Sequence, residues 1–241
     1  GCRMKTKPLG HKSYGSIGHL PGSRQGRDDK GVHEGQARIC TAKPRDARDS
    51  IIVQEKLDGS NVAVCNIDGT LVPVGRAGHA AISSPYEQHR LFHDWVYANL
   101  GMFGFLVPGE RLVGEWLAQA HGTIYDLESE CRNPFVAFDI MRNGHERAVY
   151  QELFDRAFKP GRGLCGPAIL GQGCMTIDEA IRRLCGNGHY GSTETAEGAV
   201  WRVERDGKVD FLAKYVRPDK VDGKYLPEVS GQPAIWNWRP E

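Results

Sequence analysis

The chain has 241 residues, 40% of them hydrophobic and 25% charged, and a formal net charge of +1. A chain of this size and composition can bury a sizeable core, which excludes a disordered tail or a fibre. No apolar run approaches the roughly 20 residues that span a bilayer, and no charged-then-apolar leader opens the sequence. The sequence therefore predicts no membrane association and a cytoplasmic location.

Basic residues are concentrated near the start of the chain. Residues 1–50 hold eleven Lys and Arg against five Asp and Glu, a local net charge of +6. Such a basic, glycine-rich segment suits a surface that tracks a phosphate backbone, and a solvated N-terminal segment is the alternative. We expect residues 1–50 to pack on, or lead into, a domain formed by residues 51–241.

The first predicted strand, 51–55, leads directly into a lysine. The apolar residues Ile51 to Val53 are followed by Lys56-Leu57-Asp58-Gly59-Ser60-Asn61. Strands are predicted at 62–67 and 71–74, joined by Asp68-Gly69 in a tight hairpin. This hairpin carries Arg76 back toward Lys56.

A helix is predicted to follow the hairpin. Ser84-Pro85-Tyr86-Glu87 has the pattern of a capping box with proline at the first helical position. The apolar residues of this helix recur at helical spacing and should form one buried face. They are Leu91, Phe92, Trp95 and Val96.

The rest of the chain alternates strands with loops and one more helix. Strands are expected at 111–116 and 135–141, with residues 120–123 as a loop at the edge of a site, and residues 158–173 as an exposed segment. A second helix should begin at Thr176, with Glu179 three residues on, and end at Gly186. Its inward residues should be Ala180, Ile181 and Leu184.

The last predicted element is a hairpin of strands 199–203 and 209–214 around Asp206-Gly207. Strands joined mostly as hairpins, with few helices, indicate an α+β fold with mainly antiparallel sheets and helices packed outside.

Six segments share the order expected of one enzyme class. They are Lys56-Leu57-Asp58-Gly59, Gly75-Arg76-Ala77-Gly78, Leu112-Val113-Gly114-Glu115-Trp116, Phe135-Val136-Ala137-Phe138-Asp139-Ile140, Glu197-Gly198-Ala199-Val200-Trp201-Arg202 and Phe211-Leu212-Ala213-Lys214-Tyr215. At these residues the chain resembles the covalent nucleotidyltransferase superfamily of ATP-dependent ligases and capping enzymes, whose motifs I, Ia, III, IIIa, IV and V match in order. The resemblance implies a nucleotide pocket between two antiparallel sheets.

Two further segments are most similar to the RNA ligase branch, especially its nick-sealing and RNA-editing type. Gly59-Ser60-Asn61 follows the lysine, and Tyr14-Gly15-Ser16-Ile17 lies upstream of it. The resemblance covers roughly residues 13 to 217. It implies RNA ends or nicks as partners, with DNA as a second option, and ATP with Mg²⁺ or Mn²⁺ as cofactors.

The chemistry places a demand on Lys56. An amine with a pKa of about 10.4 costs roughly 4.6 kcal/mol to deprotonate at pH 7, so partial burial or nearby cations should lower that pKa. Lys56 would then attack the α-phosphorus of ATP, hold AMP and pass it to a 5′-phosphate. A 3′-hydroxyl would displace AMP and seal the strand.

The resemblance also implies roles for the surrounding residues. Arg76 would bind phosphate or ribose, Glu115 a ribose hydroxyl, and Phe138 the adenine face. Glu197 would bind the metal or orient Lys56, and Lys214 would neutralise the α-phosphate. The remaining nucleotide contacts are assigned to Glu55, Asp58, Gly59 and Asn61.

The chain departs from the family pattern in three places. Motif V keeps one lysine, Lys214, so Arg217 or Lys220 could supply the missing phosphate contact. Motif IV ends in Arg202 rather than lysine, which changes the donor geometry. Only 27 residues follow Lys214, too few for an OB-fold domain, so a partner protein could supply one.

Two kinds of alternative remain open. An ATP-dependent DNA ligase, a GTP-using capping enzyme, or a module that binds nucleic-acid ends without turnover would share many of these motifs.

The seven cysteines include no Cys-x-x-Cys pair, which favours reduced thiols over disulfides. A zinc site is an alternative for four residues whose spacing matches no known knuckle, namely Cys165, Cys174, Cys185 and His189.

Overall fold

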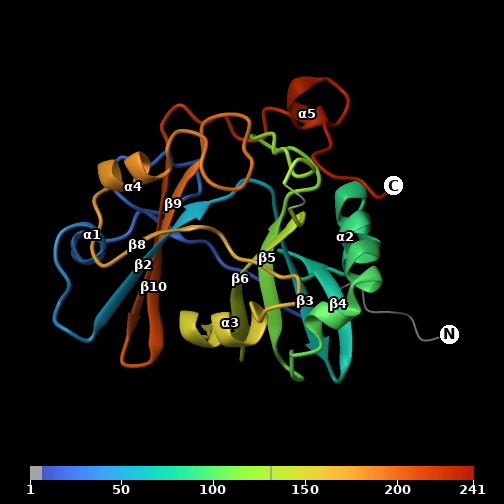
Figure 1. The fold of residues 1–241 in the computed structure, drawn as a ribbon, viewed down its shortest axis with the longest axis horizontal. Helices are drawn as coiled ribbons and strands as arrows, with labels where there is room; N and C mark the ends of the chain where they lie inside the picture. Colours follow the sequence, from blue (N-terminus) through green and yellow to red (C-terminus); the bar gives the residue numbers. More distant parts are fainter. Residues whose placement is uncertain (1–6, 131) are drawn as a thin grey trace.

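A computed structural model describes residues 7–130 and 132–241, and two five-stranded sheets form its centre with helices on their outer faces (Figure 1). Cys2 and Cys131 lie outside the described residues. The predicted α+β class with two mainly antiparallel sheets is confirmed. No helix in the described ranges has the length and apolar character needed to cross a bilayer.

Sheet A consists, in spatial order, of β1 (Gly18–His19), β10 (Lys208–Val216), β9 (Gly198–Arg205), β2 (Asp49–Lys56) and β8 (Ile169–Gln172). Sheet B consists of β4 (Thr70–Gly75), β3 (Ser60–Ile67), β5 (Arg111–Trp116), β6 (Phe135–Arg142) and β7 (Glu146–Arg147). Among the strand pairs of residues 7–130 and 132–241, β1 and β10 are the parallel one. The N-terminal segment therefore adds an edge strand to sheet A.

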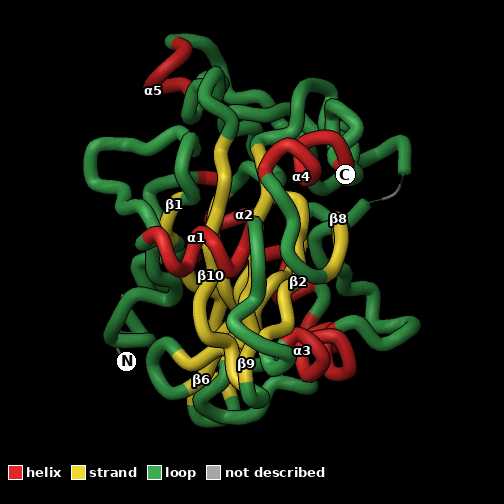
Figure 2. The backbone as a smooth tube through the Cα atoms, turned by 90° about the vertical axis from the view of Figure 1, so that its left-hand side faces the viewer, coloured by secondary structure: helices red, strands yellow, loops and turns green. Residues whose placement is uncertain are grey.

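The helices cover the outer faces of the sheets. Helices α1 (Glu34–Thr41) and α4 (Ile177–Arg183) lie over sheet A, as Figure 2 shows from that side. Helices α2 (Glu87–Ala98) and α3 (Tyr150–Ala157) pack on sheet B. The short elements are η1 (Ala81–Ser83), η2 (Leu100–Phe103) and α5 (Pro227–Ser230).

Strand alternation gives sheet A two different faces. Ile51 and Val53 of β2 and Trp201 of β9 are buried in one apolar cluster with α1 and α4. Because successive side chains point to opposite faces, Gln54 and Lys56 point to the other face, toward sheet B. The strand that buries the core on one side therefore presents its lysine between the sheets.

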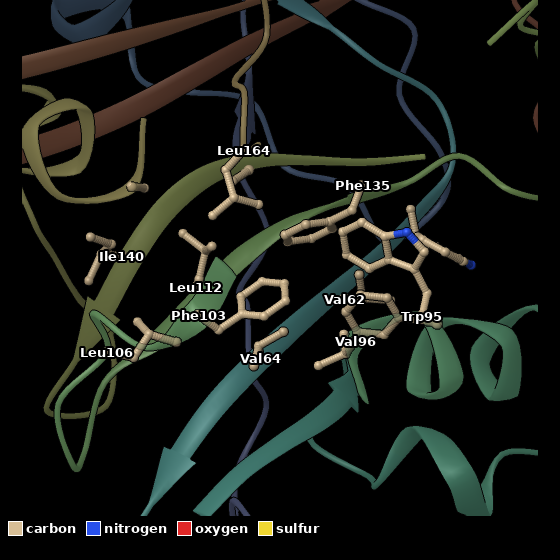
Figure 3. Close-up of a cluster of buried hydrophobic side chains, with 14 of the residues drawn as sticks. Val62, Val64, Trp95, Val96, Phe103, Leu106, Leu112, Phe135, Ile140 and Leu164 are labelled. Carbon is tan, nitrogen blue, oxygen red and sulfur yellow. The ribbon is translucent and has the colours of Figure 1, made fainter. Parts of the chain in front are cut away.

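Sheet B is held to α2 by a cluster of aromatic rings (Figure 3). Phe92 and Trp95 of α2 pack against Trp116, with ring centroids 5.2 and 5.6 Å away. The predicted apolar face of this helix is confirmed, since Phe92 and Val96 are fully buried. Such pairs add about 0.5–1.5 kcal/mol each beyond their burial, so this cluster fixes the outer wall of the site.

The predicted start of α2 is wrong. The helix begins at Glu87, and its N-cap residue Tyr86 has no side-chain cap hydrogen bond. The Ser84 hydroxyl lies instead 2.7 Å from His89 Nδ1. Ser84 is the residue that follows the preceding turn, η1, and its backbone is extended, with φ of −69° and ψ of 142°, so the chain leaves a helical path before α2 starts.

The two Asp-Gly hairpins are confirmed. Asp68 and Gly69 have φ of 51° and 89°, and Asp206 and Gly207 have φ of 51° and 73°. Two positive φ angles at the centre of a two-residue loop match the right-handed twist of the flanking strands. Sequence therefore fixes the register of β3 with β4 and of β9 with β10.

Two predictions after residue 158 need correction. Residues 158–173 are not simply exposed, because they contain β8, which pairs with β2, and the buried Leu170. Helix α4 begins as predicted, with the Thr176 hydroxyl accepting from the Glu179 N–H. Ile181, however, is 43% exposed, because one helical step of 100° turns it away from the row that buries Ala180.

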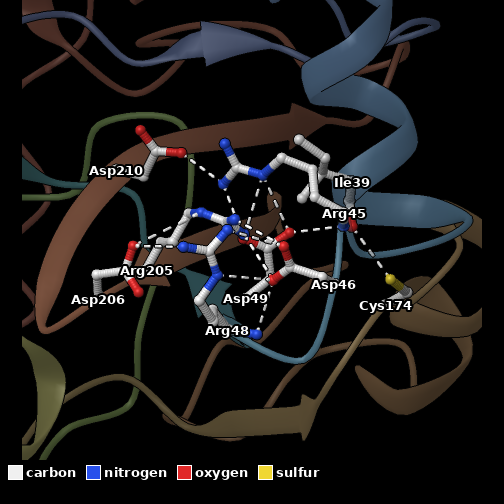
Figure 4. A network of polar contacts seen from close by, with 9 residues as sticks. All are labelled: Ile39, Arg45, Asp46, Arg48, Asp49, Cys174, Arg205, Asp206 and Asp210. Atoms are coloured by element: carbon white, nitrogen blue, oxygen red, sulfur yellow. Dashed lines mark hydrogen bonds and ion pairs between the residues drawn. The ribbon is translucent and has the colours of Figure 1, made fainter.

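A network of ion pairs closes the end of sheet A remote from Lys56 (Figure 4). The buried carboxylate of Asp49 accepts from Arg45 and Arg205, each at 2.8 Å. Arg205 also pairs with Asp46. The network ties the segment before β2 to the β9–β10 hairpin, roughly 23 Å along β2 from Lys56 at about 3.3 Å per residue.

Candidate active site between the two sheets

A cavity of about 830 Å³ lies between the inner faces of the sheets. Eight of the ten site residues predicted from the sequence line it, and Asp58 and Glu197 do not. The eight are Glu55, Lys56, Gly59, Asn61, Arg76, Glu115, Phe138 and Lys214. Residues from five strands and two loops therefore converge on one space large enough for a nucleotide.

Lys56 is held by a buried carboxylate at the back of this cavity. Its Nζ donates to Glu197 Oε2 at 2.8 Å, and the Glu197 side chain is only 7% exposed. Lys56 is the last residue of β2 and pairs with Gly198 of β9. A Cβ at Gly198 would lie 1.8 Å from the carbonyl oxygen of Tyr215, so glycine is required beside the lysine.

The pKa of Lys56 moves opposite to the expectation from sequence. Desolvation lowers it, but the nearby carboxylates of Glu197, Glu115 and Asp58 outweigh burial and hold the pKa above its usual value. Lys56 is therefore an ammonium group in this state. An amine in this state could act as a nucleophile only after the charges around it change.

Glu115 lies beside Lys56 on the other sheet. Burial raises the pKa of Glu115 to about 7, although Lys56 opposes the shift. Its Oε1 accepts from the Gly59 N–H at 3.0 Å. A Cβ at Gly59 would lie 2.4 Å from the carbonyl oxygen of Trp116, so the glycine of Lys-x-Asp-Gly admits the neighbouring strand.

Two cations, Lys214 and Arg76, line one side of the cavity. Burial and the nearby Lys56 lower the pKa of Lys214, and no Asp or Glu of residues 7–130 or 132–241 forms an ion pair with it. Arg76 donates to the Gly15 carbonyl oxygen at 3.2 Å and contacts the Ser16 hydroxyl at 3.3 Å. With Lys56, these groups make a positive concavity that suits a polyphosphate.

The remaining wall offers an aromatic face and an unused polar atom. Phe138 packs edge-on against Tyr14, with ring centroids 5.3 Å apart. Asn61 Oδ1 is buried and has no hydrogen-bond partner among the described residues. A buried polar atom without a partner costs free energy that a bound ligand can recover. This cavity is therefore suited to a polar ligand with an aromatic part.

A polar network that the motifs did not reveal joins the sheets at the cavity floor. Asp139 of β6 accepts from the Tyr14 hydroxyl at 2.6 Å and from Arg202 of β9 at 2.6 Å. Arg147 adds a third contact at 3.3 Å. The arginine that ends motif IV is thus a buried link between the sheets. Nothing in the sequence around Arg202 indicates that Asp139 is its partner.

Arg202→Met is expected to destabilise the fold by about 3–5 kcal/mol, because it removes the closest cation from a buried carboxylate. Urea unfolding monitored by tryptophan fluorescence measures this. The control is Arg48→Met, since Arg48 is in an exposed ion pair and its loss should change the stability much less. Equal losses in the two variants would contradict a structural role for the Asp139–Arg202 pair.

Two residues predicted to contact the nucleotide, Glu55 and Asp58, have side-chain partners outside the cavity. The Glu55 carboxylate points to the opposite face of β2 and accepts from the His189 N–H at 2.8 Å, so only the Glu55 backbone faces the cavity. Asp58 Oδ2 accepts from the Gly122 N–H and the Thr123 hydroxyl, both at 3.0 Å. The predicted loop 120–123 does lie at the edge of the site.

The proposed substitutes for the missing motif V lysine are wrong. Lys220 is 2% exposed and pairs with Asp58. Arg217 donates to the Ala196 carbonyl oxygen at 3.1 Å and pairs with Asp219. Neither side chain lines the cavity, because both lie in the segment that follows β10 and are held by these other contacts.

One cavity residue was missed by sequence reasoning altogether. His89 of α2 lies between two hydroxyls, with Ser60 at 2.8 Å from Nε2 and Ser84 at 2.7 Å from Nδ1. Burial lowers the pKa of His89 to about 4, so its ring is neutral at physiological pH. A lone histidine on a helix gives no pattern by which it could have been found.

The residues suit a metal that arrives with a nucleotide better than a resident one. Over residues 7–130 and 132–241 there is no group of three metal-binding side chains, and the zinc alternative is therefore wrong. Mg²⁺ and Mn²⁺ commonly use one or two carboxylates together with substrate phosphates and water. Glu197 and Glu115, beside the cationic wall, fit that need.

The fold is that of a nucleotidyltransferase domain of the ligase type. The model of the RNA ligase family matches residues 49–216, and the chain belongs to this family. No curated protein sequence matches the chain closely enough to count as a relative.

Solved structures share the fold at low identity. A variant of the Naegleria gruberi RNA ligase with ATP and Mn is 18% identical with a TM-score of 0.51, over 83% of this chain and 59% of that one. A second variant with ATP and Mn has a TM-score of 0.50 over 89% and 61%. An archaeal ATP-dependent RNA ligase is 21% identical with a TM-score of 0.47, over 70% and 43%. The chain thus spans less than two thirds of these proteins.

Proposed function

We propose that this chain is an ATP-dependent RNA ligase that forms a covalent lysyl-AMP intermediate on Lys56. The observation that supports this most is the Lys56 ammonium, 2.8 Å from Glu197, at the wall of a cavity between the sheets of an RNA ligase fold. The Naegleria relative with ATP and Mn is consistent with ATP and a divalent cation here.

In the first step, Lys56 Nζ attacks the α-phosphorus of ATP. The ammonium first loses a proton to the solvent. The P–N bond then forms as the P–O bond to pyrophosphate breaks, and the nitrogen releases a second proton to the solvent. A divalent cation bound with ATP would supply further charge neutralisation at the phosphates. Lys214 and Arg76 draw the phosphates to the cavity wall. The negative triphosphate by itself favours the Lys56 ammonium, so the neutral amine depends on these two cations and on the divalent cation that would accompany ATP.

The cavity positions the rest of the nucleotide. Phe138 offers a face for adenine, Glu115 an acceptor for a ribose hydroxyl, and the unpartnered amide of Asn61 a polar contact. Phosphoryl transfer depends mainly on such positioning and on charge neutralisation. The neutral ring of His89 holds the Ser60 and Ser84 hydroxyls at the cavity wall without adding charge.

Two transfers then complete the reaction. A 5′-phosphate oxygen attacks the phosphorus of lysyl-AMP, which breaks the P–N bond, forms a phosphoanhydride and returns the amine. A 3′-hydroxyl then attacks the 5′-phosphorus, forms the phosphodiester and releases AMP. We also propose that sealing uses a further domain or a partner protein, since the solved relatives are longer. A cytoplasmic location stays a prediction from the sequence.

Transfer to a defined end tests this function. The protein is labelled with ATP that carries ³²P at the α-phosphate, freed of ATP, and offered 5′-phosphorylated nicked duplexes and single strands of RNA and DNA. We expect the label to move to RNA 5′-phosphates and then to be released as AMP as strands join. Preferred transfer to DNA would favour a DNA ligase, and labelling by GTP alone a capping enzyme. A protein that binds ends but takes no label would be an end-binding module.

A further inference from the structure

Tyr86 is a large aromatic side chain that is exposed at the mouth of the cavity. It lines the cavity, and yet 55% of the residue is accessible to solvent. Among the exposed large apolar side chains of residues 7–130 and 132–241, Tyr86 is the one that also lines the cavity. An aromatic ring in this position contributes little to the core and offers a flat surface to a ligand.

The backbone that carries this ring is fixed. The Tyr86 N–H donates to the Ser84 hydroxyl at 3.2 Å, and the Tyr86 carbonyl oxygen accepts from the His89 N–H at 3.2 Å. The first turn of α2 is attached to sheet B, because the Trp116 indole N–H donates to the Gln88 carbonyl oxygen at 2.8 Å. A ring held on such a backbone loses little conformational freedom when a ligand stacks on it.

A single contact joins Tyr86 to the turn that follows the nucleophile. Its ring packs edge to face with the ring of His89, with centroids 5.8 Å apart and an angle of 84° between the planes. His89 Nε2 in turn lies 2.8 Å from the hydroxyl of Ser60, four residues after Lys56. Because a contact of this geometry covers at most one face of the tyrosine, the other face is open to a ligand.

A cation lies beside the ring. Arg90 is four residues after Tyr86, and its Nη1 donates to the Ser84 carbonyl oxygen at 2.7 Å. Over residues 7–130 and 132–241 no Asp or Glu forms an ion pair with Arg90, and the neighbouring Glu87 pairs instead with Arg239. The guanidinium therefore keeps its charge for an external anion, and its planar donors suit a phosphate.

Tyr86 belongs to a different wall of the cavity from Phe138, the face proposed for adenine. In sheet B, Ser60 is level with Trp116 and Phe135. Phe138 is therefore two strands across and three residues along from Ser60, roughly 14 Å away at about 4.8 Å per strand and 3.3 Å per residue. A second base is thus the kind of group that Tyr86 can accept while the nucleotide occupies the cavity.

We propose that Tyr86 is a stacking platform for the terminal base of a strand to be joined, and that Arg90 contacts a phosphate of the same strand end. Every nucleobase has a face that can stack on an aromatic ring, so this contact places the end of a strand without reading its sequence. The inference rests on the proposed function in one respect, since it takes nucleic-acid ends as the ligand. The site holds the end near Ser60, at the edge of the cavity that contains Lys56.

The test is a cycle between a protein variant and a strand that lacks one base. Fluorescence anisotropy, without ATP, measures the affinity for a 5′-phosphorylated single-stranded RNA with an internal dye. Matched RNAs carry an abasic nucleotide at the 5′ end or at the 3′ end. We expect Tyr86→Ala to bind the intact RNA about tenfold more weakly and to bind one of the abasic RNAs as well as wild type does. The end whose base is coupled to Tyr86 is the end that the platform holds.

Three further variants define what the ring and the cation contribute. Tyr86→Phe keeps the ring and should bind like wild type. Tyr97→Ala is the matched control, because Tyr97 lies on the same helix, is 47% exposed and does not line the cavity. Arg90→Met should weaken binding of all three RNAs and lower the dependence of log affinity on log salt by about 0.7, the value for one phosphate contact on a single strand.

Two results would overturn the proposal. One is a wild-type protein that binds none of these RNAs. The other is a Tyr86→Ala variant that loses the same factor for intact and abasic RNAs, which would make Tyr86 a structural residue or part of a protein-docking surface.

Because this assay needs no ATP, its failure is distinct from that of the proposed function. If the protein takes no label from ATP but the base is coupled to Tyr86, the ligase function fails and the platform stands. If the protein is labelled and seals RNA while the coupling is absent, the platform alone is removed.

Discussion

Lys56→Arg is expected to fold normally and to lose formation of the labelled protein by at least about a thousandfold. Arginine keeps the positive charge that pairs with Glu197, so the buried carboxylate remains compensated. Its guanidinium is always protonated and has no free lone pair for the α-phosphorus. A loss of labelling in this variant therefore reflects the missing nucleophile and not a missing positive charge. Removal of a nucleophile commonly lowers the rate of an enzyme by a thousandfold or more.

Labelling by ³²P at the α-phosphate of ATP, after denaturation of the protein, measures this effect. The control is Lys208→Arg, since Lys208 is exposed at the start of β10 and should leave the rate unchanged. Lys56→Ala is a poorer variant because it leaves Glu197 buried without its cation, so lost stability would be mixed with lost chemistry. Labelling of Lys56→Arg at the wild-type rate would show that another residue takes the nucleotide.

Glu115→Gln is expected to stabilise the protein at pH 8 and to weaken its binding of ATP. The folded-state pKa of Glu115 is about 7, above its ordinary value of 4.5. Between these values the folded state holds a proton that the unfolded state has lost, so the Glu115 contribution to stability falls as pH rises and is lost by pH 7. The contribution of Glu115 to the free energy of unfolding is therefore about 3 kcal/mol smaller at pH 7 than below pH 4.5. An amide is neutral at every pH and avoids this loss.

Chemical unfolding at pH 5 and pH 8 measures how much the free energy of unfolding changes with pH. Fluorescence or calorimetric titration measures ATP binding. We expect Glu115→Gln to flatten the decline in stability between these pH values, and to weaken ATP binding about fivefold through a weaker hydrogen bond to the ribose. Glu34→Gln, at an exposed position of α1, is the control. A parallel pH slope in Glu115→Gln and wild type would contradict the raised pKa.

Much of the fold followed from local signals. The Asp-Gly turns set two hairpins, and strict alternation placed Lys56 on the face opposite the buried Ile51 and Val53. Both signals act over a few residues, so a single sequence contains them. The short β1 and β8 could not be found that way, because each depends on pairing with a strand distant in sequence.

The same distinction between local and distant contacts applies to the site. Residues in motifs on strand ends were gathered at the cavity as predicted, because a strand fixes which way its side chains point. The partners of charged groups were not predicted. Asp58 and Lys220 are 162 residues apart in the sequence, and Asp139 and Arg202 are 63 residues apart. Patterns over a few neighbouring residues cannot predict such pairs. The elevated pKa of Lys56 likewise depends mainly on carboxylates distant in sequence, Glu197 and Glu115.

The central claim is that one lysine accepts the nucleotide. The most direct test is mass spectrometry of peptides from wild-type protein incubated with ATP and Mg²⁺, with acidic conditions avoided to preserve a P–N bond. The account predicts a mass increase of one adenylyl group on the peptide that contains Lys56, reversed by added pyrophosphate. An adenylyl group on Lys214 or Lys220, or strand joining without any adduct, would contradict it.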